Sequence, residues 1–128
     1  MAYGKIVADQ IQHSSEGTVG TQYVVNGSAK AWCNINCITT TVLNDSLNIS
    51  SLTDVDVGKT TLAHTNSMSS GYYSVTTACA LNGDSVFGGD LGTASLVTTT
   101  GHRIQCRDEG AVFTDPDIAC SQVIGDLA

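Results

Sequence analysis

The sequence predicts an all-β fold: an antiparallel β-sandwich or flattened barrel of about eight strands, with an extended N-terminal arm. Short segments of alternating apolar and polar residues recur roughly every 8–12 residues, and turn-forming Gly, Asn, Asp and Ser separate them. The chain is rich in Thr and Gly but poor in the strong helix formers Glu, Lys, Arg and Leu. No segment shows the apolar spacing of an amphipathic helix, so strands are expected throughout.

The clearest strand lies in residues 29–37, which contain the single Trp of the chain. One set of side chains is expected to face the core: Ala31, Cys33, Ile35 and Cys37. The alternate set is expected to face outward: Lys30, Trp32, Asn34 and Asn36. Asn26-Gly27 just before this strand is a strong tight-turn dipeptide, so residues 23–25 are expected to form a hairpin with it.

The other elements follow from β-branched runs and from the Gly, Asn and Asp that interrupt them. Residues 1–22 are expected to form an attachment or trimerisation arm, and residues 23–128 a single β-sandwich domain. Loops are expected at residues 13–21, 64–71 and 82–92, and a turn at Asn44-Asp45. The remaining strands are expected at residues 39–43, 47–52, 59–63, 72–81, 93–100, 103–106, 111–113 and 118–124.

The charge of the chain excludes several classes of function. Five basic residues against 12 acidic ones give a net charge of −7, and the basic residues form no run, so no nucleic-acid partner is expected. No apolar run is long enough to cross a membrane, and no export leader is evident. Only 13% of the residues are charged, which favours a subunit whose faces are covered by copies of itself or by neighbouring proteins.

The five cysteines leave three alternatives open, and their odd number means that at least one cannot pair within the chain. They are reduced and buried, or they form disulfides that include a link between subunits or to a partner protein, or they bind metal. Cys33 and Cys37 lie about 13 Å apart along one strand face, too far to share an ion or a bond. The candidates for an intersubunit disulfide are Cys33, Cys37, Cys106 and Cys120.

No catalytic constellation is apparent, and no metal or cofactor is expected. The three histidines, His13, His64 and His102, are all expected in solvated loops or turns. The candidate contact surface consists of Tyr72 and Tyr73 together with Phe87, which is expected to anchor the Gly-rich loop 82–92. The alternative places Tyr73 in the core and Tyr72 on an ordinary surface.

The order of several motifs resembles a small β domain of tail-fibre and other virion structural proteins of tailed phages, including cyanophages. Ala-Lys-Ala-Trp at residues 29–32 precedes an alternating strand, and Ser-Ser-Gly-Tyr-Tyr-Ser-Val occupies residues 69–75. The resemblance covers residues 1–12 and 23–80. The chain departs from the family pattern at Cys33, Ile35 and Cys37, where family members often carry Val and an aromatic residue after the Trp.

The resemblance implies a virion structural protein without enzymatic activity, most simply a short tail fibre that faces the host surface. It also implies a homotrimer attached to baseplate or tail proteins, assembled in the host cytoplasm, and a host glycan as an outside partner. A trimeric capsid decoration protein is the alternative, with capsid proteins as partners. A carbohydrate-binding β module outside any virion is the second alternative.

Overall fold

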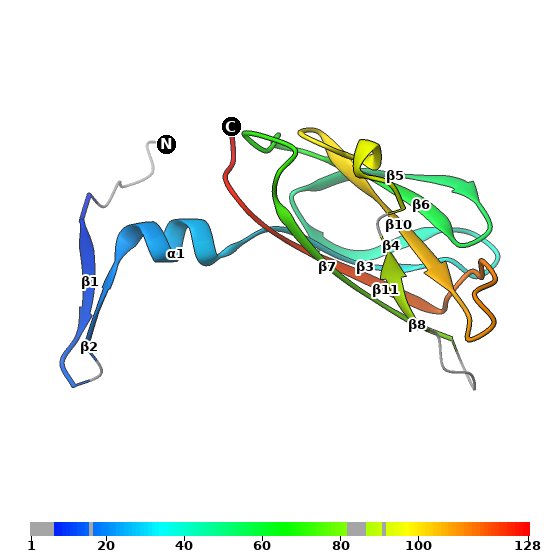
Figure 1. Cartoon of the computed structure of the whole chain (residues 1–128), viewed down its shortest axis with the longest axis horizontal. Coiled ribbons are helices and arrows are strands. Elements are labelled where there is room, and N and C mark those ends of the chain that lie inside the picture. The colour runs from blue at the N-terminus through cyan, green and yellow to red at the C-terminus, as the bar shows by residue number, and fades with distance from the viewer. Residues whose placement is uncertain (1–6, 16, 82–86, 91) are drawn as a thin grey trace.

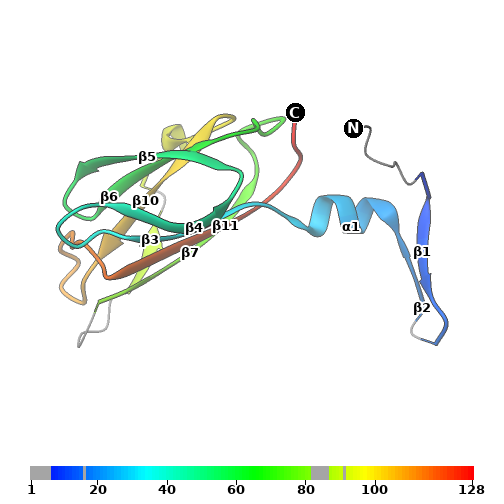
Figure 2. The same cartoon turned by 180° about the vertical axis from the view of Figure 1, so that it is seen from behind.

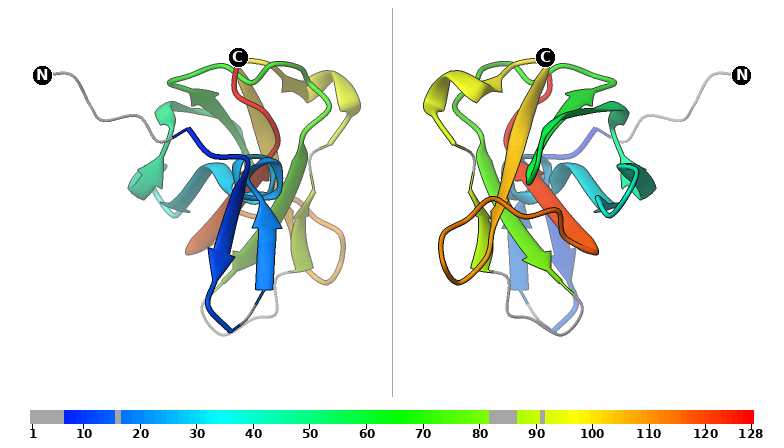
Figure 3. Two further views of the ribbon diagram at one scale, coloured as in Figure 1. Left: turned by 90° about the vertical axis from the view of Figure 1, so that its left-hand side faces the viewer. Right: turned by 90° about the vertical axis from the view of Figure 1, so that its right-hand side faces the viewer.

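The structure is a computed structural model, and it describes residues 7–15, 17–81, 87–90 and 92–128 (Figure 1). It has the predicted all-β architecture, because two antiparallel sheets pack face to face as a sandwich. An N-terminal arm extends away from one end of the sandwich (Figures 1 and 2). Figure 3 looks along the long axis, with the hairpin of the arm in front of the sandwich in the left view.

The arm consists of an antiparallel hairpin and a short helix. Strands β1 (Gln10–His13) and β2 (Gly17–Gly20) pair with Ile11 opposite Val19, and helix α1 (Thr21–Gly27) follows. The predicted strand at residues 23–25 is therefore wrong. Asn26-Gly27 does not turn a hairpin, because it closes the last turn of α1, where the Ser28 N–H donates to the Val24 carbonyl. The arm thus continues five residues beyond the expected boundary at residue 22, to Gly27.

The first sheet of the sandwich, called here the β3 sheet, has the strand order β4-β3-β11-β7. Its strands are β3 (Ala29–Asn36), β4 (Val42–Leu47), β7 (Ser74–Ala80) and β11 (Ile118–Ile124). The alternation predicted around the Trp is confirmed: Ala31, Cys33 and Ile35 are buried on the inner face of β3. Because β3 and β11 are the two central strands, their inward-facing residues form the part of the core that this sheet contributes.

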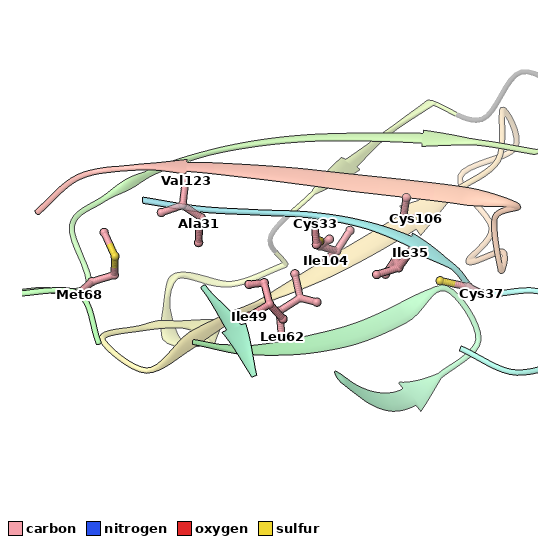
Figure 4. Packing of buried hydrophobic residues seen from close by; sticks show 11 residues of the cluster. Ala31, Cys33, Ile35, Cys37, Ile49, Leu62, Met68, Ile104, Cys106 and Val123 are labelled. Carbon is pink, nitrogen blue, oxygen red and sulfur yellow. The ribbon is translucent and has the colours of Figure 1, made fainter. Parts of the chain in front are cut away.

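The second sheet, called here the β10 sheet, has the order β5-β6-β10-β8, and the short β9 also pairs with β10. Its strands are β5 (Ile49–Asp56), β6 (Lys59–His64), β8 (Phe87–Asp90), β9 (Val97–Thr98) and β10 (Gly101–Arg107). Leu62 and Ile104 extend from β6 and β10 toward the β3 sheet (Figure 4).

Several local predictions are corrected by the structure. The expected loop 13–21 contains β2, the described part of the expected loop 82–92 contains β8, and the expected strand 39–43 begins only at Val42. Asn44-Asp45 lies inside β4, and the chain reverses instead at Asn48, whose φ of 59° is a left-handed conformation that Asn tolerates. Residues 93–100 form a 3-10 turn, η1 (Ala94–Leu96), and the two-residue strand β9. The predicted strand 111–113 is reduced to one bridge between Arg107 and Phe113.

A disulfide between Cys79 on β7 and Cys106 on β10 joins the two sheets. Both cysteines belong to inward-facing positions of their strands. The bond closes a loop with a sequence separation of 27 residues, so it removes many conformations from the unfolded chain. The sandwich therefore has a covalent link as well as an apolar core.

Reduction of the Cys79–Cys106 disulfide is expected to lower the free energy of unfolding by about 3 kcal/mol, because the closed loop is released in the unfolded chain. Urea unfolding followed by circular dichroism, with and without dithiothreitol, measures the difference. The Cys120→Ser variant is the control and is expected to show the same dithiothreitol effect as the wild type. Equal unfolding midpoints with and without dithiothreitol would contradict the prediction.

Candidate functional site

A chain of buried polar side chains crosses the core from one sheet to the other. Nε2 of His64 lies 3.2 Å from Nδ1 of His102, and Nε2 of His102 lies 3.1 Å from the Oγ of Ser121. The same Oγ lies 3.3 Å from the Sγ of Cys33. We call these four residues the core relay. His64 and His102 come from the β10 sheet, whereas Ser121 and Cys33 are opposite residues on β11 and β3.

The core relay is uncharged at neutral pH. Burial, and next the neighbouring His64, lower the pKa of His102 to about 4. Burial also lowers the pKa of His64, although the backbone of Thr99 opposes the shift. Burial raises the pKa of the Cys33 thiol in spite of its hydrogen bonds to Ser121. Each neutral imidazole carries one N–H, so every contact has one donor and one acceptor when all protons run in the same direction.

The arrangement of the core relay suits cohesion rather than catalysis. His102 is 1% exposed and His64 is 8% exposed, so a substrate has no direct access to the rings. The thiol of Cys33 is 2% exposed and protonated, whereas nucleophilic cysteines are thiolates in accessible sites. What the relay supplies is a chain of three contacts in a medium of low dielectric. The contact between His102 and Ser121 joins the two sheets, whereas Nδ1 of His64 is buried without a hydrogen-bond partner.

The prediction of solvated histidines is wrong for His64 and His102. The sequence carried a usable signal, because His64 comes two residues after the buried Leu62 and His102 comes two residues before the buried Ile104. Both rings therefore continue the inner faces of β6 and β10. The side chain of His13, in β1, lies outside the described side chains.

Tyr73 covers the outer end of the core relay. Its ring centroid lies 5.8 Å from that of His64 and 6.4 Å from that of His102. The hydroxyl lies 2.9 Å from the carbonyl oxygen of Thr98 and 2.8 Å from that of Gly101, and its single O–H donates to one of them. Burial raises the pKa of Tyr73 to about 12, so the hydroxyl stays protonated. Tyr73 thus ties residues 71–73 to β9 and β10.

An open cleft of about 860 Å³ lies beside Tyr73, between residues 71–73 and residues 92–99. A smaller hollow of about 170 Å³ adjoins it, and both include Tyr72 and Tyr73 in their walls. The side chain of Tyr72 is 99% exposed at the boundary between the two. We call these two hollows together the Tyr72 cleft.

The structure brings two of the three predicted contact residues together. Tyr72 and Tyr73 precede β7, whereas Phe87 begins β8 on the other side of that strand in the sequence. In the β10 sheet, Phe87 pairs with Arg107 at one end of β10, while Tyr73 contacts Gly101 at the opposite end. Phe87 is therefore not part of the Tyr72 cleft, and its side chain lies outside the described side chains. Residues 82–86, expected as part of the same loop surface, lie outside the described residues.

The four cysteines proposed for an intersubunit bond have different surroundings. Cys33 and Cys37 are buried in the core, and Cys106 is bonded to Cys79 of the same chain, which corrects the expectation for Cys106. Cys120 is half-buried on the outward side of β11, where the Asn34 Nδ2 lies 3.3 Å from its Sγ. Of the four, Cys120 alone has partial access to a partner.

The described part of the chain contains no group of three or more His, Cys, Asp or Glu side chains arranged to hold a metal ion. Its helices are too short and too polar for a transmembrane span. Comparison with protein-family models, curated proteins and solved structures gives no match for this chain.

Acid is expected to destabilise the fold through His102. The folded pKa of about 4 lies below the ordinary value of 6.5, so the stability from the neutral ring is complete above pH 6.5 and is lost as the pH falls toward 4. The loss is expected to reach a few kcal/mol at the acid end. Urea unfolding midpoints at pH 7.5 and pH 4.5 measure it. In His102→Gln the slope between these pH values should be shallower, because residue 102 no longer gains a proton on unfolding and only the smaller contributions of His64 and the carboxylates remain. An unchanged slope would show that His102 does not carry the effect.

A covalent link between chains, where it forms, is expected to run through Cys120. Non-reducing electrophoresis of the oxidised protein should show a species heavier than the monomer, and one accessible thiol per chain limits that species to two chains. Cys120→Ser should remove it, whereas Cys37→Ala, which changes a buried thiol, should leave it in place. Survival of the heavier species in Cys120→Ser, or its absence from the oxidised wild type, counts against this assignment.

Proposed function

We propose that this protein is a non-enzymatic structural subunit of a phage virion, a short tail fibre that assembles as a homotrimer and faces the host surface. The arm carries the assembly, and the sandwich is the rigid body that it holds in place. The resemblance around the Ala-Lys-Ala-Trp motif supports the virion assignment. The observation that supports assembly is an arm whose apolar side chains are not covered by any of the described residues.

None of the described side chains between residues 7 and 28 is buried. Ile11 and Val19 face each other across the hairpin, yet both are exposed. On α1, Tyr23 is 69% exposed and Val25 is 57% exposed, and Val24 is exposed as well. Covering such side chains stabilises a structure by about 1.5–3 kcal/mol each when burial is complete, so the arm has a strong drive to associate.

The arm elements are also too small to be stable without support. A two-stranded hairpin is marginal in water, and α1 has only 7 residues, fewer than an isolated helix needs. A second copy of the arm supplies both the missing apolar contacts and the additional helix packing. A closed symmetric assembly meets this need, because every arm in it makes the same contacts with its neighbours.

The absence of an enzymatic role is part of the same proposal. Two described residues have strongly shifted pKa values: His102, which is buried and neutral, and Tyr73, which is half-buried and protonated. The Tyr72 cleft has hydroxyls and aromatic rings in its walls but no paired acid and base. Both features fit a binding and scaffolding protein.

The Val24→Glu substitution is expected to dissociate the trimer, because it places a charge in the apolar contact between helices. Sedimentation equilibrium at micromolar concentration should give a trimer for the wild type and a monomer for the variant, with an unchanged β-sheet circular dichroism spectrum. Val112→Glu is the matched control, since Val112 is 61% exposed in the loop after β10, away from the arm. A monomeric wild type, or a variant that remains trimeric, contradicts the role of the arm.

Location in the particle tests the virion assignment. Purified particles labelled with an antibody against the sandwich are expected to carry the label on the tail in electron micrographs. Label on the head would favour a capsid decoration protein instead. Particles that contain none of this protein by mass spectrometry would overturn the assignment.

A further inference from the structure

We propose that the Tyr72 cleft binds an uncharged oligosaccharide and that the ring of Tyr72 is its stacking platform. This inference rests on the proposed function, for which it names the class of outside ligand and the residues that hold it. It is carried by three features of the described residues: an unsupported aromatic ring, a preformed cleft beside it, and the chemistry of the cleft walls.

The ring of Tyr72 is unusual because it is large, apolar over both faces and 99% exposed. The backbone that carries the ring is nevertheless held in place. The Tyr72 N–H donates to the Oγ of Ser70 at 3.2 Å, and Gly71 lies so close to β9 that a Cβ there would be 3.2 Å from the Val97 carbonyl oxygen. Because the backbone is fixed and Tyr has only two side-chain torsions, stacking of a ligand on the ring costs little conformational entropy. Aromatic rings with one polar end suit surfaces that are both apolar and wet, as the face of a pyranose ring is.

The walls of the cleft offer hydrogen bonds to a ligand of many hydroxyls. The larger hollow is lined by Thr93, Thr98 and Thr99 beside the two tyrosines and Gly71. The smaller hollow is lined by Asn26, Ser69 and Asp126, which supply an amide, a hydroxyl and a carboxylate. Ligand sites of this size combine apolar surface with a few polar groups that fix orientation. A sugar matches both requirements, because C–H groups cover its ring faces and hydroxyls surround its edge.

The charge of the cleft selects among sugars. No lysine or arginine is among the described residues that line either hollow, and Asp126 is the one charged group there. The chain as a whole carries a net charge of −7. Sialylated or uronic-acid glycans would be repelled, and no cation would compensate their carboxylates. Hollows on both sides of Tyr72 favour a ligand of at least two sugar rings, one on each side or one over the ring and one beside it.

The position of the cleft makes one other occupant possible. Asn26 of α1 lines the smaller hollow, so the cleft lies at the end of the sandwich from which the arm departs. The arm of a sister copy is therefore the competitor for this surface. The chemistry favours a sugar, because the cleft walls combine apolar surface with the hydroxyls of three threonines and the carboxylate of Asp126, whereas the arm presents apolar side chains such as Ile11 and Val24.

The test uses the full-length protein on an array of neutral and acidic oligosaccharides with hexose, N-acetylhexosamine and deoxyhexose termini. The strongest binder is then measured by saturation-transfer NMR and by calorimetry. Binding is expected to neutral glycans, with weaker binding to a matched sialylated form. Tyr72→Ala should weaken it by about tenfold or more, and Tyr72→Phe, which keeps the ring, by less than about threefold. Because the ring of Tyr72 makes no contact that the fold requires, both variants should unfold at the wild-type urea concentration.

Sedimentation of the same proteins separates the two proposals. A trimer that binds none of the glycans overturns the site and leaves the proposed assembly intact. A monomer that binds neutral glycans through Tyr72 supports the site and overturns the assembly. Binding that survives Tyr72→Ala, stronger binding of acidic glycans, or a Tyr72→Ala variant that dissociates instead of losing glycan overturns the site.

Discussion

The hydrogen bond between His102 and Ser121 is the polar contact on which the packing of the two sheets depends. It joins β10 to β11 in a core that combines larger side chains such as Ile35 and Leu62 with small ones such as Ala31 and Ala119. Small side chains give few dispersion contacts, so the sandwich gains from additional links between its layers. The core relay supplies one, and the disulfide at Cys106 supplies another, four residues farther along the same face of β10. Both links have one of their residues in β10, so this strand fixes the spacing between the two sheets.

A relay of this kind restricts everything around it. Its members are satisfied only while each finds its neighbour, since an orphaned ring or hydroxyl in the core costs more than the hydrogen bond contributes. The outer end must also be closed to water, which Tyr73 does by covering both imidazoles and donating its hydroxyl proton to a backbone carbonyl. The loop before β7 and the turn into β10 are consequently held together. A scaffold protein gains from this rigidity, because the surface that it presents keeps its shape in every copy.

The fold class and the central strand could be predicted because they depend on a local alternation of apolar and polar residues, as around Cys33 and Ile35. The core relay could not, because its partners are 19 to 88 residues apart in the chain and meet only through the packing of the sheets. Helix α1 was missed for a different reason. Asn26-Gly27 is compatible with both a hairpin turn and a helix end, and Tyr23-Val24-Val25 has strand propensity. The structure favours the helix end, since no neighbouring strand is available to pair with these residues on the free arm.

The exposed ring of Tyr72 follows in part from the requirement to seal the relay. The alternation of β7 continues backward, with Val75 and Tyr73 turned inward and Ser74 and Tyr72 turned outward. Because the ring of Tyr73 packs against His64 and His102, the side chain of residue 72 must face solvent. Geometry thus explains the direction of this side chain but not its size, because a serine or threonine would satisfy the same backbone without exposing an aromatic ring to water. A large ring at this point is explained when a partner covers it for part of the time. The hollows on either side combine apolar surface with hydroxyls, which indicates a partner that has both apolar and polar surface.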